Sequence, residues 1–468
     1  MNGTTIKTML NEPKSKNDIK YANESFRYES ILDHNVSERV FKMLSEAENL
    51  IEDGYVPLYL LSDPEIYEAE RIKIFATSWN FLAHESEIPY PGDYVVRYIE
   101  QTPLIVVRGE DNIIRVFLNV CPHKGREFVK AEIGNTSHIR CPYHGFVYNT
   151  RGKLVGCPVQ KHAIGDIINY NDFNMYRINS EIYHGFIFGN LDPKPKKDLL
   201  NFLGDFKFYF DLVSNKSDTG LTFTNPQRWV VPFNWKAAAD NFAGDIYHAF
   251  TAHATGYALF PKETIKANAV LTGLQVDAGN GHGIAFSRII DSPQWYGNWW
   301  PELIKKAKNT LTESEYKFWT KYSTSTIIGN VFPNFGFLNA GMPFKGGSTK
   351  ESIAPILTFR VWNPISSDKT QIWNWFAIEN DAPDDLKKYS YLAYQHSFTA
   401  NGVFEEDDME NWITQTHAGK SMLKLKLAEK VGEYKPLINV GAPGKIQSYP
   451  SDIGSMSFWR ELVNKLLE

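Results

Sequence analysis

Two short cysteine–histidine pairs constrain this chain more than any other feature of its sequence. Cys121 and His123 form a C-x-H pair. After 17 intervening residues, Cys141 and His144 form a C-x-x-H pair. Thiolate and imidazole groups are common metal ligands, and at this spacing one loop can present both groups to one centre. The sequence therefore predicts a metal centre held by two loops.

Two kinds of metal centre take two cysteines and two histidines. Zinc fingers draw both cysteines from one segment and both histidines from another. A Rieske [2Fe-2S] centre places two cysteines on one iron and two histidines on the other. Each loop here offers one of each, so each loop can reach both irons, and we favour the Rieske centre with zinc as the alternative. A proline after each cysteine and a glycine close behind each histidine stiffen the loops and admit the backbone to the cluster.

The composition indicates a globular protein and excludes some classes of partner. The chain has 468 residues, of which 43% are hydrophobic and 22% charged, and its formal net charge is -5. This charge excludes binding to nucleic acid through bulk positive charge, and no run approaches the roughly 18 apolar residues of a membrane span. Three cysteines cannot form a disulfide framework, and the N-terminus lacks the apolar segment of a secretory signal, so we expect a cytoplasmic protein. Neither nucleic acid nor a membrane is expected as a partner.

Local patterns divide the chain into three predicted regions, residues 1–77, 78–195 and 196–468. The first is predicted to be helical, with a helix that starts at Asp63-Pro64; its polar residues 1–25 are expected to be disordered. Short runs rich in Val and Ile predict that the second region is all-β. Its turns are predicted at GEDN and NTRG, its last strand at EIYHGFIFGNL, and its end at the proline- and lysine-rich residues 191–200.

The third region mixes helices and strands. Residues 235–253 have a helical pattern, whereas residues 354–362 and 371–378 predict two neighbouring strands. Two further helices are predicted between Pro383 and Gly419, separated by a break at Asn401-Gly402. The mixture indicates a domain distinct from the all-β region that precedes it.

The helical pattern of residues 235–253 contains a second candidate site. His248 and His253 are five residues apart, so on a regular α-helix their rings would diverge by about 140°. The rings converge only where the helix is widened or unwound, as at a π-bulge, and such bulges mark functional sites. The alternative is a pair of structural histidines, each with its own hydrogen bonds.

An acidic segment near the C-terminus favours the functional interpretation of the two histidines. The segment NGVFEEDDMENW spans residues 401–412 and starts a predicted helix, where acidic residues also favour the helix dipole without any metal. Phe404 and Trp412 lie four residues before and after Asp408, so they predict a buried face around this carboxylate. A buried carboxylate needs a partner, and two histidines with one carboxylate form the non-haem Fe(II) triad.

From about residue 60 onward the chain resembles the large (alpha) subunit of the aromatic-ring-hydroxylating dioxygenases, the Rieske non-haem iron oxygenases. The matching segments, in the family's order, are CPHKG, CPYHG, NWK, DNFAGDIYHAFTAH, VFPNFGFL and FEEDDMENW. The resemblance implies an α+β fold. An all-β Rieske [2Fe-2S] domain would be joined to a helix-grip catalytic domain, an antiparallel sheet with helices, on which the N-terminal helical segment packs.

The resemblance also implies the ligands of two metal centres. The [2Fe-2S] cluster would be held by the two cysteine–histidine pairs, and a mononuclear Fe(II) by His248, His253 and Asp408. The choice of Asp408 over Asp407 rests on the family pattern alone.

Two further residues receive catalytic roles from the resemblance. Asp245 matches the family's bridging aspartate, which orients the ligand His248 and meets the Rieske histidine of a neighbouring subunit, here His144. Asn241 matches an asparagine near the iron. Electrons would pass from His144 through Asp245 to His248 across a subunit boundary.

The neighbours of these motifs predict an apolar substrate pocket. Its predicted residues are Phe242, Ile246, Ala249, Phe398 and Phe404. The small Ala249 leaves room for a polycyclic substrate, and these segments contain no arginine that could hold a substrate carboxylate. Plain core packing is the alternative for each of these side chains.

The function implied by the resemblance is that of a terminal oxygenase component. It would use O2 to dihydroxylate an apolar aromatic substrate to a cis-dihydrodiol. Electrons would come from a separate ferredoxin and reductase, since no flavin or nicotinamide fingerprint is present. A homotrimer, or an α3β3 hexamer with a small beta subunit, is expected. The alternatives are a Rieske monooxygenase or demethylase, and a non-catalytic Rieske electron carrier.

The sequence departs from the family at two cluster-loop positions. Lys124 and Phe146 stand where arginine and tryptophan are more common in the family. Cytochrome bc-type Rieske proteins place a hydroxyl donor where Phe146 stands. Because hydrogen bonds to the sulfurs raise the potential, we expect a reduction potential near the low end of the Rieske range, about -150 mV.

Overall fold

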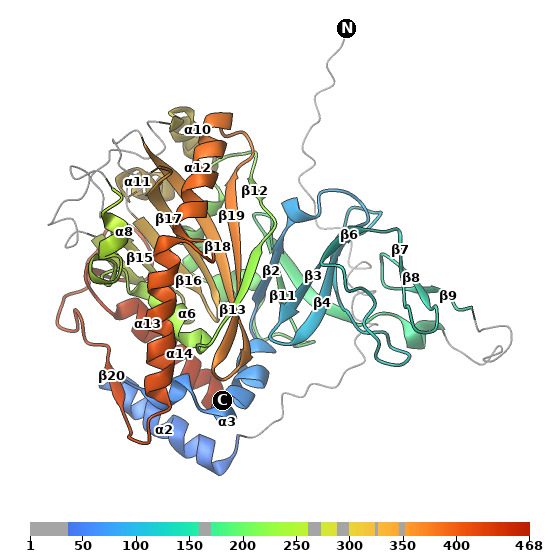
Figure 1. The fold of residues 1–468 in the computed structure, drawn as a ribbon, viewed down its shortest axis with the longest axis horizontal. Coiled ribbons are helices and arrows are strands. Elements are labelled where there is room, and N and C mark those ends of the chain that lie inside the picture. The colour runs from blue at the N-terminus through green and yellow to red at the C-terminus, as the bar shows by residue number, and fades with distance from the viewer. Residues whose placement is uncertain (1–35, 159–169, 261–272, 288–298, 323–325, 346–351) are drawn as a thin grey trace, which may run out of the picture. The chain divides into compact units, whose positions relative to one another are not determined.

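The computed structural model describes residues 36–158, 170–260, 273–287, 299–322, 326–345 and 352–468 (Figure 1). The chain forms two compact units. The first contains Tyr90–Val96 and Leu104–Ile178, and the second contains the described part of Ser30–Pro89 together with Arg97–Pro103 and Asn179–Glu468. Because the units interleave along the sequence, a division by single cuts after residues 77 and 195 stays a prediction. The predicted disorder of residues 1–25 lies outside the described residues.

The first unit is built from β-strands. The strands that lie wholly or partly in it are β3 (Asp93–Ile99), β4 (Thr102–Arg108), β5 (Ile114–Leu118), β6 (Ile133–Asn135), β7 (His138–Arg140), β8 (Val147–Asn149), β9 (Leu154–Gly156) and the start of β10 (Arg177–Tyr183). The order β10-β5-β4-β3-β6 forms one sheet in this unit, and β7-β8-β9 forms another. The predicted GEDN and NTRG turns are confirmed, since they join the antiparallel pairs β4–β5 and β8–β9.

The second unit combines helices with antiparallel strands. Its helices are α2 (Glu38–Glu52), α3 (Pro64–Glu70), α4 (Leu199–Leu203), α5 (Phe206–Ser214), α6 (Trp235–Gly244), α7 (Ala249–Ala252), α8 (Ala254–Tyr257), α10 (Glu302–Thr310), α11 (Glu313–Tyr322), α12 (Asp384–Ser397), α13 (Val403–Gly419) and α14 (Ile453–Leu467). Its strands, besides the ends of β3 and β10 and the start of β4, are β1 (Tyr55–Pro57), β2 (Asn80–His84), β11 (Phe186–Asn190), β12 (Leu221–Phe223), β13 (Gln227–Val231), β14 (Gly273–Asp277), β15 (Gly283–Ser287), β16 (Thr326–Val331), β17 (Phe335–Pro343), β18 (Ile353–Ser366), β19 (Lys369–Glu379), β20 (Lys426–Ala428) and β21 (Lys445–Ser448).

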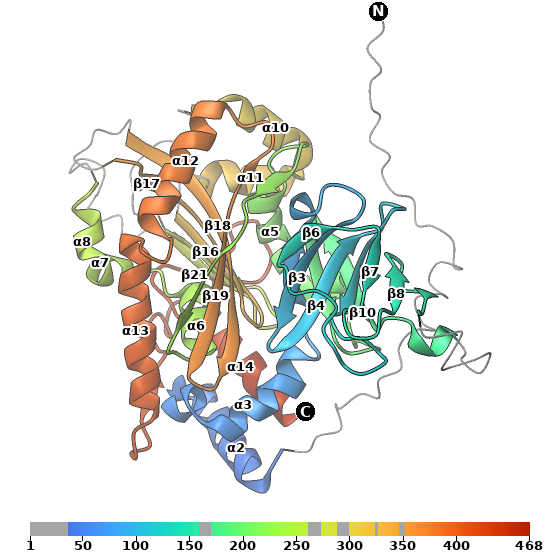
Figure 2. The ribbon, with the colours of Figure 1, turned by 45° about the vertical axis from the view of Figure 1, so that its right-hand side comes forward.

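A large antiparallel sheet is the centre of the second unit. Its order is β12-β19-β18-β17-β16-β15-β14-β21, and β13 also pairs with β19. The predicted neighbouring strands are confirmed as β18 and β19, which pair antiparallel. The two predicted helices after Pro383 are α12 and α13. Helix α12 packs against β17 and β18, whereas α13 runs beside the sheet in the view of Figure 2. An α+β fold with a helix-covered antiparallel sheet is therefore confirmed.

Strand β18 is buried on both of its faces. On one face Trp362 packs against Phe242 of α6, with ring centroids 4.7 Å apart. On the other face Phe359 packs against Phe186 and Phe223, with centroids 4.9 and 5.1 Å apart. Successive side chains of a strand point to opposite faces, and both faces here meet aromatic side chains. This explains why the strand is a nearly continuous apolar run rather than an alternating one.

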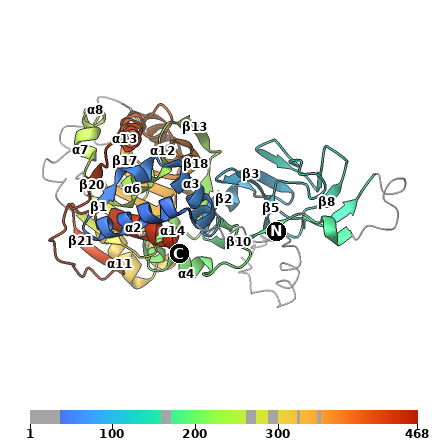
Figure 3. The same ribbon diagram turned by 90° about the horizontal axis from the view of Figure 1, so that it is seen from below.

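The predicted helix start at Asp63 is confirmed. The Asp63 side chain accepts hydrogen bonds from the backbone N–H groups of Glu65 and Ile66, and Pro64 occupies the first position of α3. The helix continues as a π-helical turn at Arg71–Phe75. Helix α2, which precedes α3 in the sequence, packs beside α14, as the view from below shows (Figure 3). The residues that α2 buries recur every three or four positions: Val40, Leu44, Ala47 and Ile51.

The expectation of one strand at EIYHGFIFGNL is wrong. The structure has two antiparallel strands there, β10 and β11, joined at His184 and Gly185. These two residues have φ angles of 49° and 83° and form a tight turn. Gly185 suits a positive φ, but the pair His184-Gly185 lacks the Asn-Gly or Asp-Gly signature of a two-residue hairpin turn. In the described part of the chain, no helix combines the length and apolar character needed to cross a membrane.

A buried ion pair joins α3 to α6. The Lys236 Nζ atom lies 2.6 Å from Glu70 Oε1, and neither side chain is more than 1% exposed. Glu70 also accepts a hydrogen bond of 2.9 Å from Trp235 Nε1. Burial raises the pKa of Glu70 and the Lys236 charge opposes this shift, so the carboxylate depends on its partner.

We expect Lys236→Met to destabilise the chain by about 3–5 kcal/mol, because it leaves a buried carboxylate without its cation. The matched control is Lys42→Met, which breaks the exposed Lys42–Glu38 pair of α2. This control should cost at most about 0.5 kcal/mol. Urea unfolding followed by circular dichroism measures both. Equal effects of the two substitutions would contradict the role given to the buried pair.

Candidate metal centres

The two cysteine–histidine loops of the first unit have the same backbone structure. In each loop the cysteine N–H donates to the carbonyl five residues later, Cys121 to Arg126 and Cys141 to Phe146, at 2.8 Å. The glycine four residues after each cysteine donates back to the cysteine carbonyl at 2.9 and 3.0 Å. Both glycines have a φ of 71°, a conformation in which glycine is favoured. The loops thus form a matched pair.

The donor atoms of these loops fit a two-iron cluster. Cys121 and Cys141 are buried free thiols. The rings of His123 and His144 lie with centroids 4.5 Å apart. The Nδ1 atom of each ring is buried and has no hydrogen-bond partner among the described residues. Two sulfurs and two unpartnered imidazole nitrogens are the donor set of a Rieske centre.

Two aromatic residues, Phe146 and Tyr148, contact the loop ligands, and the contact of Tyr148 was not predicted. Phe146 stacks on the His123 ring, with ring centroids 4.7 Å apart, and as expected it offers no hydrogen-bond donor to the cluster. However, the Tyr148 hydroxyl lies 3.7 Å from Cys121 Sγ. Tyr148 is two residues beyond Phe146, so alternation along the strand could have revealed it. The sequence interpretation, which considered only Phe146, therefore missed one donor to a cluster sulfur.

The helix predicted at residues 235–253 is broken in the structure. Helix α6 ends at Gly244, and a single turn, α7, resumes at Ala249. His248 and His253 are the residues that flank this turn. The predicted local unwinding is present, but as a break in the helix and not as a π-bulge. The two rings, at opposite ends of α7, lie with their centroids 5.2 Å apart.

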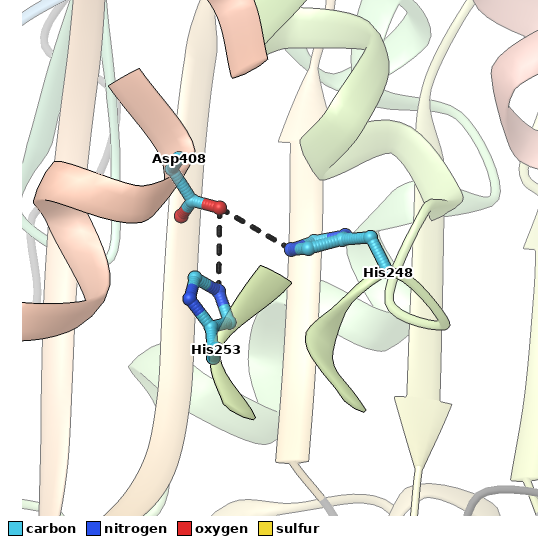
Figure 4. Close-up of side chains that lie close together, drawn as sticks. All are labelled: His248, His253 and Asp408. Atoms are coloured by element: carbon cyan, nitrogen blue, oxygen red, sulfur yellow. Dashed lines mark ion pairs between the residues drawn. The ribbon is translucent and has the colours of Figure 1, made fainter. Parts of the chain in front are cut away.

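The two histidines and Asp408 converge on one point (Figure 4). Asp408 Oδ1 lies 3.2 Å from His248 Nε2 and 3.3 Å from His253 Nε2. The three donor atoms all lie within 4.8 Å of one another. Asp408 is only 3% exposed, and its Oδ1 makes no hydrogen bond to the described residues. This arrangement has the donors of a two-histidine, one-carboxylate iron site.

Groups behind the two rings turn their Nε2 atoms toward Asp408. The Nδ1 atom of His253 lies 3.1 Å from Asp407 Oδ2. The Nδ1 atom of His248 forms a short contact with the Asp245 carbonyl oxygen. Nδ1–H donation to these acceptors leaves both Nε2 lone pairs free. The structure therefore separates the two aspartates, with Asp408 in front of both rings and Asp407 behind one.

Asp245 and Asn241 both lie beside His248. The Asn241 Nδ2 atom is 3.1 Å from His248 Nδ1 and 3.4 Å from Asp245 Oδ2. Asp245 Oδ1 is 3.5 Å from His248 Nδ1. The Asp245 carboxylate can therefore orient this ring, and Asn241 donates to that carboxylate; the catalytic roles of both residues stay predictions.

The electrostatics of this site favour a positive charge between its groups. Burial opposes ionisation of Asp408, but His253 and His248 outweigh it and hold the pKa of this carboxyl well below its usual range. Burial also opposes protonation of His248, yet Asp245 and Asp408 raise its pKa well above the usual value. A proton satisfies this preference, and so would a metal cation.

His248, His253 and Asp408 border a cavity. All five predicted pocket residues line it: Phe242, Ile246, Ala249, Phe398 and Phe404. Their role in substrate binding stays a prediction. The sequence interpretation missed five other lining residues, Tyr257, Thr326, Ile328, Leu338 and Met342. Thr326 and Ile328 share one face of β16, and Leu338 and Met342 share one face of β17. The period-two pattern identifies these faces only once the strands are known to border the site.

Two family models match the chain. A Rieske [2Fe-2S] domain matches residues 78–171. The catalytic domain of the ring hydroxylating alpha subunit matches residues 220–434. The first match contains both cysteine–histidine loops, and the second contains all three converging residues.

We expect Tyr148→Phe to lower the reduction potential of the cluster, because it removes a hydroxyl donor near a cluster sulfur. A spectroscopic redox titration of the visible cluster absorption measures the shift. Tyr143→Phe is the control, since it removes a hydroxyl from a ring that is 62% exposed. An unchanged potential in Tyr148→Phe would contradict the assigned hydrogen bond.

Known proteins resemble the chain over most of its length. It is 30% identical to the N,N-dimethyl phenylurea N-demethylase subunit alpha of Sphingobium sp. (strain YBL2), over 94% of this chain and 98% of that one. It is 33% identical to a benzene 1,2-dioxygenase subunit alpha of Pseudomonas putida, over 80% of this chain and 82% of that one. The crystal structure of naphthalene 1,2-dioxygenase from Rhodococcus sp. bound to indole has 36% identity and a TM-score of 0.87, covering 92% of this chain and 99% of that one. The chain therefore belongs to the ring-hydroxylating alpha subunit family, whose members carry a Rieske [2Fe-2S] cluster and a mononuclear iron.

Proposed function

We propose that this chain is a terminal oxygenase component that dihydroxylates an apolar aromatic compound to a cis-dihydrodiol. The observation that carries the proposal is the cavity beside His248, His253 and Asp408, which is lined mainly by apolar and aromatic side chains. Two of the similar proteins are named as benzene and naphthalene dioxygenases. An apolar lining with a few polar groups is the usual form of a site for such a substrate, and the cavity of about 40 Å³ would have to widen to admit an aromatic ring.

The residues present fit both cofactors of the family. His248, His253 and Asp408 would hold the mononuclear iron, and the four cysteine and histidine donors of the first unit would hold the cluster. When bound, the cluster would supply electrons and the iron would activate O2.

The cavity residues would bind and orient the substrate. Phe242, Phe398 and Phe404 present aromatic surface to it and exclude water. No lysine or arginine lines this cavity in the described part of the chain. A substrate carboxylate would thus find no cationic partner, and this supports an uncharged aromatic substrate.

The groups behind the rings would keep the histidines ready to bind metal. The Asp407 carboxylate and the Asp245 carbonyl would hold the Nδ1 protons of His253 and His248. Each Nε2 lone pair then stays directed at the metal position.

We propose the partners that the resemblance implies and the location that the cysteine content indicates. A ferredoxin and its reductase would supply electrons, and the chain would form a homotrimer or an α3β3 hexamer in the cytoplasm. The exposed Tyr143 ring lies 3.9 Å from the His144 ring, so this cluster ligand lies close to the surface that a donor or a second copy would reach.

A second reaction also has specific support. The relative aligned over 98% of its own length is named as an N-demethylase. Monooxygenation or demethylation of a substituted substrate is therefore the alternative function. The same two metal centres would serve it.

The products formed with isotopically labelled O2 test the proposed reaction. We expect the purified chain, supplied with a ferredoxin and reductase, to convert naphthalene or biphenyl to a dihydrodiol in which both hydroxyl oxygens carry the label. Mass spectrometry of the product measures this. Formation of only singly labelled products, or demethylation of a dimethyl phenylurea without any dihydrodiol, would contradict dioxygenation and support the alternative.

We expect Asp245→Ala to retain both metal centres and to lower coupled product formation by roughly tenfold to a hundredfold, because His248 loses the carboxylate beside it. Iron and sulfide counts and product per electron consumed measure the two effects. Asp385→Ala, at an exposed position of α12, is the control. Full coupled turnover in Asp245→Ala would contradict its assigned role.

A further inference from the structure

A fully buried ion pair lies next to the candidate iron site. The Arg360 Nη1 atom on β18 is 2.6 Å from Glu405 Oε2 on α13, and both side chains are 0% exposed. Desolvation of two charges is costly, so a buried ion pair is seldom the most stable way to fill space. Its presence here therefore indicates a role that apolar side chains of similar size could not fill.

Glu405 anchors the helix that carries the carboxylate ligand. It lies in the first turn of α13, three residues before Asp408, so both side chains lie on the same side of the helix. Gly402 precedes this helix and offers no side-chain cap. The contact from Arg360 therefore holds the helix start from a neighbouring strand.

Arg360 also contacts two walls of the cavity. Its guanidinium carbon lies 5.1 Å from the ring centroid of Phe242 and 5.0 Å from that of Phe398. Phe242 belongs to α6 and Phe398 follows α12, and both line the cavity. Cation–π contacts of this kind are strongest where water is excluded. One buried cation thus joins α6, the end of α12 and the start of α13.

The pair is held together by charge. In the described part of the chain, neither the guanidinium nitrogens nor the carboxylate oxygens have a hydrogen-bond partner outside the pair. Burial raises the pKa of Glu405 to about 7, while Arg360 lowers it and Asp408 raises it. The Glu405 charge therefore responds both to its partner and to the iron-site carboxylate.

We propose that Arg360 and Glu405 are a positioning pair for the iron site: they fix the first turn of α13 so that Asp408 faces the two histidines, and they balance each other's charge beside a cation site. The inference rests on the proposed function, because it requires that His248, His253 and Asp408 bind iron.

Unequal effects of the two single substitutions are the signature of this role. Glu405→Gln leaves a guanidinium that cannot lose its proton, and this cation would repel iron. Arg360→Met leaves a carboxyl that can take up a proton, so its effect is smaller. Arg360→Met/Glu405→Leu removes both charges and should recover iron binding. If the pair served only packing, its substitutions would lower the stability of the fold but would not change the iron affinity of the folded chain.

The test is anaerobic titration of each variant with Fe(II) after the mononuclear iron has been removed by a chelator. Acid-labile sulfide counts the chains that retain the cluster, so iron above two per cluster reports the mononuclear site in folded chains only. We expect Glu405→Gln to lower the Fe(II) affinity by roughly tenfold or more. Arg360→Met should lower it less, and the double variant should approach the wild type.

Glu379→Gln is the matched control. It breaks another buried ion pair, Lys216–Glu379, whose Nζ and Oε1 atoms are 2.9 Å apart, at the end of β19. It should reduce stability without changing the Fe(II) affinity. Wild-type affinity in both single variants at the Arg360–Glu405 pair, or a double variant that binds iron no better than Glu405→Gln, would overturn the inference. If Glu405→Gln does not fold, Arg360→Met with the double variant carries the comparison. A wild-type chain without mononuclear iron would overturn the proposed function as well.

Discussion

The need for a cation between one buried carboxylate and two imidazole nitrogens is the constraint on which the rest of this structure depends. Asp408 Oδ1 lies 3.2 and 3.3 Å from the Nε2 atoms of His248 and His253, in a site that favours a cation. Asp408 comes from α13 and the histidines from a segment some 150 residues earlier in the chain. The rest of the second unit can be understood as the support that holds these segments together. The sheet buries both faces of β18, and α6 and α12 pack against its strands.

The two units position their candidate metal ligands in a similar way. In each unit the ligands lie on or beside an irregular segment, and a neighbouring helix or strand fixes the position of that segment. The cluster loops turn at glycines with a positive φ next to short strands. The histidines flank the single turn of α7, after α6 has ended at Gly244. Regular helices and strands supply the fixed positions, and the irregular segments supply the freedom to converge.

The sequence alone predicted the segments that carry the candidate metal ligands and most of the elements near them. Short motifs carry this information locally: Cys and His at fixed spacing, a proline after a capping aspartate, an Asn-Gly break. Contacts between distant segments were harder to predict. The cavity residues of β16 and β17 require knowledge of strand pairing, whereas Tyr148 could have been found from its position two residues after Phe146. The turn at His184 gave no usual signal. Nothing local showed that Asp407 lies behind a ring and Asp408 in front of it. The Arg360–Glu405 pair joins residues 45 positions apart, and a single sequence does not show such a pairing.

The central claim is that one chain holds a sulfur-bridged iron pair and, at Asp408 with two histidines, a separate single iron. Anaerobic iron and acid-labile sulfide analysis of the wild type and of Asp408→Ala tests it most directly. The account predicts about three irons and two sulfides per wild-type chain, and about two irons and two sulfides per variant chain. A variant that retains the third iron, or a wild-type chain that never binds it, would contradict the account.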